Sequence, residues 1–326
     1  MSELRDIADV LRNSSGLKAK ADIASVADAL GLSAQSETPV GDDTAAIKDG
    51  DGYTLFAIEG FINEFVRVDP WFAGWCGVMV NISDIAAMGG RPTAVVNAIW
   101  ADGEANAAPV LAGMRAASEA FGVPIVGGHT NIKTDRHQFA VAILGRAKHL
   151  LTSFDAKPGE KLIMAVDLRG RYREPFSNWE AATDAPPDRL RGDIDILPRL
   201  AETGLARAAK DISQAGIVGT AAMLAECSGV GMTIDLSAIP CPADVPLTRW
   251  LQTFPSFGYL IAAQPGKADA VLAAFHARDI AAAVIGDIHA GSTVSIRDAG
   301  EREVIWDFAE TPLLGCSTVP RLEACA

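Results

Sequence analysis

Helical and strand-like patterns alternate along the 326 residues, and this alternation limits the fold more than any other feature. Apolar residues at helical spacing predict helices at residues 71–88, 109–121, 197–209, 216–227 and 268–278. Short apolar runs predict strands at residues 54–58, 94–100, 123–126, 138–144, 161–166, 232–236, 259–263 and 283–288. Because strands and helices that alternate pack as layers, the sequence predicts an α/β protein, with a mixed sheet in its first half.

The turn Lys157-Pro158-Gly159-Glu160 separates two such series, since the apolar pattern restarts directly after it. A chain of this length also exceeds the size at which one core usually stops growing. Two short amphipathic helices are predicted within residues 3–31. We therefore expect an N-terminal helical extension at 1–37, a first domain at 38–150 and a second at 151–326.

The chain is acidic, with 28 Lys and Arg against 41 Asp and Glu and a net charge of −13. This charge argues against binding to nucleic acid or to an anionic membrane. No stretch reaches the 18 or so apolar residues that a membrane span needs. The five cysteines form no CxxC pair, which argues against a disulfide framework or a structural zinc site. We expect a cytoplasmic protein without nucleic-acid or membrane partners.

Acidic residues stand beside glycines or small residues where predicted strands and helices end. They are Asp42 and Asp43 in Gly41-Asp42-Asp43-Thr44, Glu59 before Gly60, Asp84 in Asn81-Ile82-Ser83-Asp84, and Asp211. Adjacent carboxylates repel each other unless a cation or N–H donors gather them, and a lone charge in an apolar helix is costly. Each residue also has a plain interpretation, as a turn residue, a strand end, a residue on a solvated helix face or a helix N-cap.

Two further segments are candidates. Gly127-Gly128-His129-Thr130 is predicted to be a loop between two strands, and its histidine can simply face solvent. Residues 169–193 combine cations and aromatic rings in Arg169, Arg171, Tyr172, Arg173, Phe176 and Trp179. Such a segment suits an anionic or heteroaromatic small-molecule substrate. The alternative is a solvated insertion whose arginines pair with nearby acids.

Five blocks of sequence follow one another along the chain: GDDTAAI (41–47), NISDIAAMGGRP (81–92), IVGGHT (125–130), KPGEKLIMAV (157–166) and KDISQAGIVGTAAMLAECSGVGMTID (210–235). Together they resemble the AIR synthase-related superfamily, which includes aminoimidazole ribonucleotide synthetase, thiamine-monophosphate kinase, selenophosphate synthetase and the hydrogenase maturation dehydratase. The second block, similar to the family's Asn-x-Ser-Asp-x-x-x-Met-Gly helix end, is the most specific. The resemblance covers roughly residues 38–290.

The resemblance implies a two-domain AIR synthase-like fold of the α+β class, with mixed α/β sheets. The first domain would join its sheet to that of a second copy in a homodimer, as a dimer-wide sheet or barrel, and the second would be an α/β sandwich. It also implies bound ATP with Mg²⁺.

The family's functional residues carry over one by one. Asp42, Asp43, Asp84 and Asp211 match Mg²⁺-ligating positions, and Glu59 stands where most members have Asp. Gly41, Asn81 and Thr130 would line the nucleotide site, and Gly127 and Gly128 would let backbone N–H groups approach a phosphate. His129 would orient a phosphate, transfer a proton or line the cleft. The catalytic set implied is Asp43, Asp84, His129 and Asp211. The substrate set is Arg169, Arg171, Tyr172, Arg173 and Trp179.

The implied function is an ATP- and Mg²⁺-dependent transfer or use of a phosphoryl group on a small molecule, nearest to thiamine-monophosphate kinase. Three segments depart from that kinase: AIEGFINEF (57–65), GGHT (127–130) and TFPSFGYL (253–260), which has no carboxylate. We therefore expect a different substrate. One alternative is dehydration or cyclisation, suggested by Pro320-Arg321 and Cys325 near the C-terminus. Another is a non-catalytic, nucleotide-binding dimeric scaffold.

Overall fold

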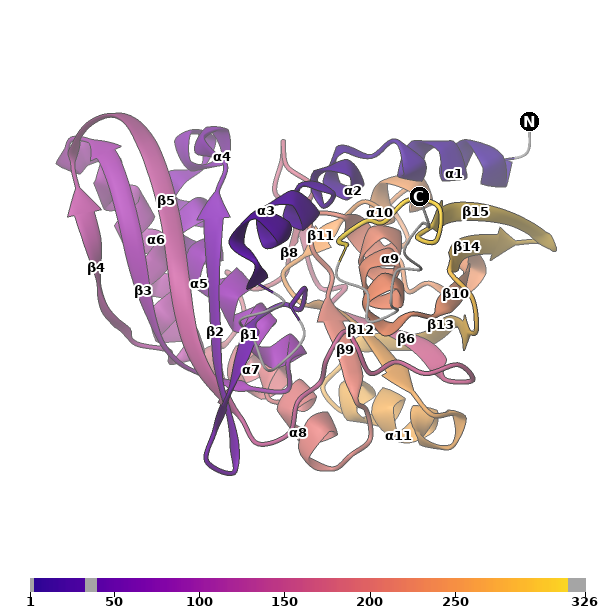
Figure 1. Ribbon diagram of the computed structural model, residues 1–326. Helices are drawn as coiled ribbons and strands as arrows, with labels where there is room; N and C mark the ends of the chain where they lie inside the picture. The colour runs from indigo at the N-terminus through magenta and orange to yellow at the C-terminus, as the bar shows by residue number, and fades with distance from the viewer. Residues whose placement is uncertain (1–2, 33–39, 316–326) are drawn as a thin grey trace. The chain divides into compact units, whose positions relative to one another are not determined.

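The computed structural model describes residues 3–32 and 40–315, which form two compact units (Figure 1). Unit 1 comprises Met1–Asp42, Leu151–Ala181 and Gly204–Ala326, and unit 2 comprises Asp43–Leu150 and Ala182–Thr203. Each unit is therefore built from separate stretches of the chain. The division at 1–37, 38–150 and 151–326 stays a prediction about family domains. Cys325 lies outside the described residues.

Unit 2 contains a five-stranded sheet in the order β1-β2-β5-β3-β4. Its strands are β1 (Ala45–Asp49), β2 (Gly52–Phe61), β3 (Arg91–Asp102), β4 (Ile125–Asn131) and β5 (Lys133–Ala147). Only β3 and β4 run parallel. Within the described part of the chain β1 and β4 are the edges, so this sheet is open. The predicted mixed α+β class is confirmed.

Helix α5 (Pro70–Ala87) covers one face of this sheet and packs on α6 (Glu104–Phe121). The crossing of the two helices is tight: a Cβ at Gly74 would lie 2.0 Å from the Val110 carbonyl oxygen, and one at Gly113 1.8 Å from that of Trp71. Against the sheet, a Cβ at Gly77 would lie 2.9 Å from the Val141 side chain. Glycine is needed at all three positions because backbones and ring edges fill the space.

The other face of the sheet carries exposed apolar side chains. Alternation along each strand places these residues together on the face away from α5: Ile47, Phe56, Ile58, Val96 and Leu144. Ile58 is 65% exposed. We call this surface the open face. Folded proteins seldom leave a contiguous apolar sheet face of this kind exposed.

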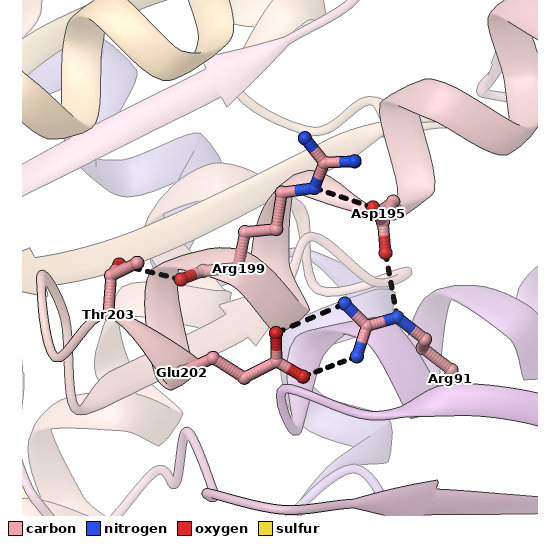
Figure 2. Close-up of polar contacts among 5 residues, drawn as sticks. All are labelled: Arg91, Asp195, Arg199, Glu202 and Thr203. Carbon is pink, nitrogen blue, oxygen red and sulfur yellow. Dashed lines mark hydrogen bonds and ion pairs between the residues drawn. The ribbon is translucent and has the colours of Figure 1, made fainter.

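The second stretch of unit 2 contains α7 (Pro187–Ile194) and α8 (Ile196–Glu202), which arginines hold in place. Arg91, the first residue of β3, donates to Asp195 at 2.8 Å and to both carboxylate oxygens of Glu202 (Figure 2). The hydrogen bond to Glu202 raises the pKa of Arg91, and the same bond lowers the pKa of Glu202. Arg191 donates to the carbonyl groups of Glu119 and Ala120, at the end of α6.

Unit 1 contains a seven-stranded sheet in the order β15-β14-β10-β13-β6-β12-β9. The strands are β6 (Lys161–Val166), β9 (Ala208–Asp211), β10 (Gly231–Asp235), β12 (Gly258–Ala263), β13 (Ala281–His289), β14 (Thr293–Asp298) and β15 (Glu301–Asp307). Helices α9 (Gly216–Ser228) and α11 (Pro265–His276) both contact it. Successive residues of β6 and β12 are buried, as expected for strands covered on both faces. The predicted α/β sandwich is confirmed.

Three helices, where two were predicted, begin the chain: α1 (Glu3–Arg12), α2 (Ser15–Ala19) and α3 (Asp22–Leu30). The Ser14 side chain accepts a hydrogen bond from the Leu17 N–H and starts a separate helix. The buried face of α1 packs on β15, and Arg12 donates to the Val304 carbonyl oxygen at 2.9 Å.

Two expected elements are wrong. Gly127–Thr130 is not a loop, because these residues hydrogen-bond with β3 as part of β4. The helix expected at 197–209 ends at Glu202, since Gly204 adopts a left-handed conformation and β9 begins at Ala208. Among the described residues, Cys76, Cys227 and Cys241 form no disulfide. The helices in this part of the chain are too short or too polar to cross a membrane. The cytoplasmic location stays a prediction.

Candidate functional site

Helix α5 places Asn81 and Asp84 on one side, three residues apart. Asp69 caps its start by accepting the Phe72 N–H, and Pro70 occupies the first turn. Asn81 is 0% and Asp84 5% exposed. The interpretation of Asp84 as a residue on a solvated helix face is therefore wrong.

The Asn81 amide has a defined orientation and an oxygen without a protein partner. Its Nδ2 donates to the Gly77 carbonyl oxygen at 2.8 Å. Its Oδ1 is buried and accepts no hydrogen bond from the described residues. An unsatisfied buried polar atom costs free energy, so such atoms point to a ligand or an ion.

Asp43 lies close to Asp84 within unit 2, with one carboxylate oxygen of each within 4.8 Å of the other. Two carboxylates at that separation favour a bound cation. Asn81 Oδ1, on the same side of α5 as Asp84, is a further oxygen donor, and Mg²⁺ and Ca²⁺ prefer sites made of oxygen donors. The residues present therefore fit a hard divalent cation.

A row of paired residues, two of them polar, crosses the sheet under α5. In register, Glu59 of β2 pairs with Val141 of β5, Val141 pairs with Asn97 of β3, and Asn97 pairs with Gly128 of β4. These positions share the face that α5 covers, because Gly77 of α5 packs on Val141. The structure thus brings Glu59 to the same face of the sheet as α5.

Asn97 belongs to this row and was not predicted as a site residue from the sequence. Its Nδ2 is buried and donates to none of the described residues. A Cβ at Gly128 would lie 2.4 Å from both the carbonyl oxygen and the Oδ1 of Asn97, so Gly128 is glycine because Asn97 fills that space. The available signal was one asparagine inside the apolar run 94–100. Gly127 has open space instead, with only Val96 at 4.0 Å.

His129 and Thr130, also in β4, point to opposite faces of the sheet. Thr130 shares the α5 face with Gly128, and His129 shares the open face with Trp100, 5.5 Å away between ring centroids. The structure therefore does not bring the His129 ring to the face that α5 and Asp84 occupy.

Gly41, Asp42 and Asp211 belong to unit 1. The Asp42 carboxylate accepts two hydrogen bonds from Ser153, one from the Ser153 N–H at 2.9 Å and one from the Ser153 hydroxyl at 2.6 Å. Asp211 is the buried last residue of β9, and pairs with Tyr259 of β12. It is not a helix N-cap, since α9 is capped at Ala215.

The basic and aromatic segment of unit 1 is largely engaged with its own surroundings. Arg169 donates to the buried Asp167 at 2.8 Å, and Trp179 is a core residue whose Nε1 donates to the Asp167 carbonyl oxygen. Tyr172 donates to or accepts from Thr253 at 2.6 Å, and burial raises its pKa. Arg171 is exposed and Arg173 half-buried.

Comparisons with known proteins agree with this architecture. Residues 41–147 match the N-terminal domain, and residues 176–299 the C-terminal domain, of AIR synthase related protein. The chain is 47% identical over 278 residues to an uncharacterized protein of Synechocystis sp., covering 85% of this chain and 86% of the relative. It is 34% identical over 322 residues to one of Methanocaldococcus jannaschii, covering 96% and 99%. It is 28% identical to a thiamine-monophosphate kinase of Halobacterium salinarum, covering 72% and 83%.

Solved structures share the fold. T. maritima PurL complexed with ATP superposes with a TM-score of 0.75 at 18% identity, covering 97% of this chain and 53% of PurL, so this chain spans about half the PurL length. AaThiL complexed with AMPPCP and TMP gives 0.67 at 18% identity, covering 86% and 96%. The chain carries both domains in order, and it belongs to the AIR synthase-related protein family.

Proposed function

We propose that this protein is an ATP- and Mg²⁺-dependent enzyme that transfers or uses a phosphoryl group on a small molecule. The observation that carries the proposal is the donor set of unit 2: the Asp43 and Asp84 carboxylates with a buried amide oxygen at Asn81 that lacks a protein partner. The nucleotide is proposed from the relatives, which include a thiamine-monophosphate kinase, PurL complexed with ATP and AaThiL complexed with AMPPCP.

In this proposal Asp43, Asp84 and Asn81 hold Mg²⁺, and the family resemblance adds Asp211 and Glu59. Bound Mg²⁺ neutralises charge on the triphosphate, which an acidic chain would otherwise repel. Asn97 Nδ2 would donate a hydrogen bond to an anionic oxygen of the ligand, on the face of the sheet that α5 covers. Gly127 pairs with Val96, so the open space beside it lies on the open face and not on the α5 face; its contact with a phosphate is implied by the family resemblance alone.

The substrate we propose differs from thiamine monophosphate, because the segment 253–260 offers no carboxylate. Arg171 and Arg173 are the proposed contacts for its anionic part. Arg169, Tyr172 and Trp179 are proposed to support that segment through the packing described above.

The test is calorimetric titration of ATP with and without Mg²⁺, followed by assay of ADP or phosphate release with candidate substrates. Asp43→Asn and Asp84→Asn should each weaken Mg²⁺-dependent ATP binding about a hundredfold, because each removes a charged ligand. Asp51→Asn, in the exposed β1–β2 turn, is the matched control and should bind as wild type. Absence of ATP binding to the wild type would refute the proposal, whereas binding without turnover would leave a nucleotide-binding scaffold.

We also propose that the protein is a homodimer joined through the open face. The exposed side chains of Phe56, Ile58 and Leu144 support this, as does the position of His129 beside Trp100 on the same face. His129 would then lie at the interface. Light scattering should give twice the chain mass for wild type and the monomer mass for Ile58→Lys with Leu144→Lys, whereas a monomeric wild type would contradict the proposal.

A further inference from the structure

Asp42 and Asp43 are neighbours in sequence but have different surroundings. Asp43 lies near Asp84 in unit 2. Asp42 faces Ser153 in unit 1, which gives one hydrogen bond to each of its carboxylate oxygens: the N–H to Oδ2 at 2.9 Å and the hydroxyl to Oδ1 at 2.6 Å. Hydrogen bonds to a charged acceptor are short and strong, so this pair fixes the orientation of the Asp42 carboxylate.

Ser153 is itself fixed by a hydrogen bond from α9. It is completely buried, and its carbonyl oxygen accepts the Ser228 hydroxyl at 2.6 Å. Ser228, the last residue of α9, also accepts the Ala156 N–H at 3.0 Å. Beside it, the Cys227 thiol lies 3.8 Å from the Gly41 carbonyl oxygen. The C-terminal end of α9 therefore anchors both the 151–156 loop and the Gly41–Asp42 backbone.

The anchor lies where the chain changes units. Asp42 ends one stretch of unit 1 and Leu151 begins the next. The hydrogen bonds between Asp42 and Ser153 thus tie the end of one stretch to the start of another. Because Asp43 follows Asp42 directly, the tie limits the positions that the Asp43 backbone can take.

We propose that Asp42 is a positioning residue and not a metal ligand: through Ser153 it fixes the backbone from which Asp43 reaches the cation. This inference rests on the proposed function. It divides the Gly-Asp-Asp motif into an anchored carboxylate and a ligating one. Removing the Ser153 hydroxyl should then impair the site although Ser153 offers the cation nothing.

The experiment compares Asp42→Asn, Ser153→Ala and the double variant, with Asp43→Asn as the ligand variant. Ser237→Ala is the matched control, because it deletes an exposed serine hydroxyl that donates to Asp235 at 2.6 Å and does not contact Asp42. Two quantities are measured: the number of Mn²⁺ ions bound, by electron paramagnetic resonance, and the Kd for ATP with Mg²⁺. Hydrogen exchange of the backbone at residues 41–46 is followed in the ligand-free protein.

We expect Asp42→Asn and Ser153→Ala each to raise the ATP Kd about tenfold, with the double variant no worse than either, because both break the same contact. The Mn²⁺ count should stay at the wild-type value in both and fall only in Asp43→Asn. Exchange at residues 41–46 should quicken equally in Asp42→Asn and Ser153→Ala.

A loss of one Mn²⁺ in Asp42→Asn, with Ser153→Ala indistinguishable from wild type, would overturn the inference and make Asp42 a ligand. Failure of the wild type to bind both Mn²⁺ and ATP would refute the proposed function instead. The exchange data then decide the positioning role alone: faster exchange in Ser153→Ala supports it, and unchanged exchange rejects it.

Discussion

Two polar groupings in this protein look equally functional in sequence but differ in how their side chains are satisfied. On α5, Asn81 keeps a buried oxygen without a protein partner, next to acidic Asp84. In residues 169–181, the part of the basic and aromatic segment that belongs to unit 1, Arg169 is paired with Asp167. The guanidinium carbon of Arg249 lies over the Tyr172 ring, 3.6 Å from the ring centroid. Unsatisfied buried groups indicate binding, whereas groups satisfied by one another indicate structure.

The largest effect expected from this comparison is at Trp179. Replacing Trp179 by Ala removes a core ring that stacks edge-on against Tyr172 and Trp250, at 5.3 Å in each case. The free energy of unfolding should fall by about 3 to 5 kcal/mol. Chemical denaturation measures this free energy, and Leu111→Ala, an exposed position on α6, is the control. A loss of substrate affinity without a loss of stability would make Trp179 a binding residue.

The opposite behaviour is expected at Asn81. Replacing Asn81 by Leu, whose side chain branches in the same way, removes an unsatisfied buried oxygen, so stability should rise by about 1 to 2 kcal/mol. The same change should abolish Mg²⁺-dependent ATP binding. Thermal denaturation and calorimetry test both parts on one sample. Lower stability together with unchanged ATP binding would make Asn81 a structural residue and end the contrast with Trp179.

A smaller effect is expected at Arg91. Arg91→Ala should destabilise the protein by about 1 kcal/mol, since its ion pairs are partly exposed. The pKa of Glu202 lies below its ordinary value of 4.5, so this contribution is present above that pH and is lost as the pH falls through the folded-state pKa. The free energies of unfolding of wild type and variant should therefore converge in acid. They should also converge in about 1 M salt, because exposed ion pairs are strongly screened there. Arg115→Ala, exposed on α6, is the control, and a difference that persists in acid would contradict the assignment.

The smallest effect is expected in the exposed part of the basic segment. Arg171→Ala with Arg173→Ala should raise the substrate KM about threefold to tenfold with little change in stability, because loss of a partly solvated ionic contact costs about 1 kcal/mol. Steady-state kinetics measures the KM, with a substrate identified by the assay of ADP or phosphate release. Unchanged KM and kcat would place the whole segment with the structural grouping.

The sequence predicts helices and strands better than it predicts which distant residues contact each other. Strand β6 and helix α9 follow from local periodicity and glycine stops, because those signals lie within the elements themselves. The pairing of Asp42 with Ser153, 111 positions away, has no local signal. The face that His129 occupies depends on the register of β4 on β3, which a prediction of a loop could not supply.

The glycine crossing of α5 and α6 has a consequence for how this site tolerates change. Helix α6 carries none of the candidate ligands, yet it leaves α5 no room to slide or retreat. A single methyl group added at Gly113 would have to push Trp71 and, with it, the rigid rod that bears Asn81 and Asp84. Loss-of-function variants should therefore cluster along a helix with no chemistry of its own.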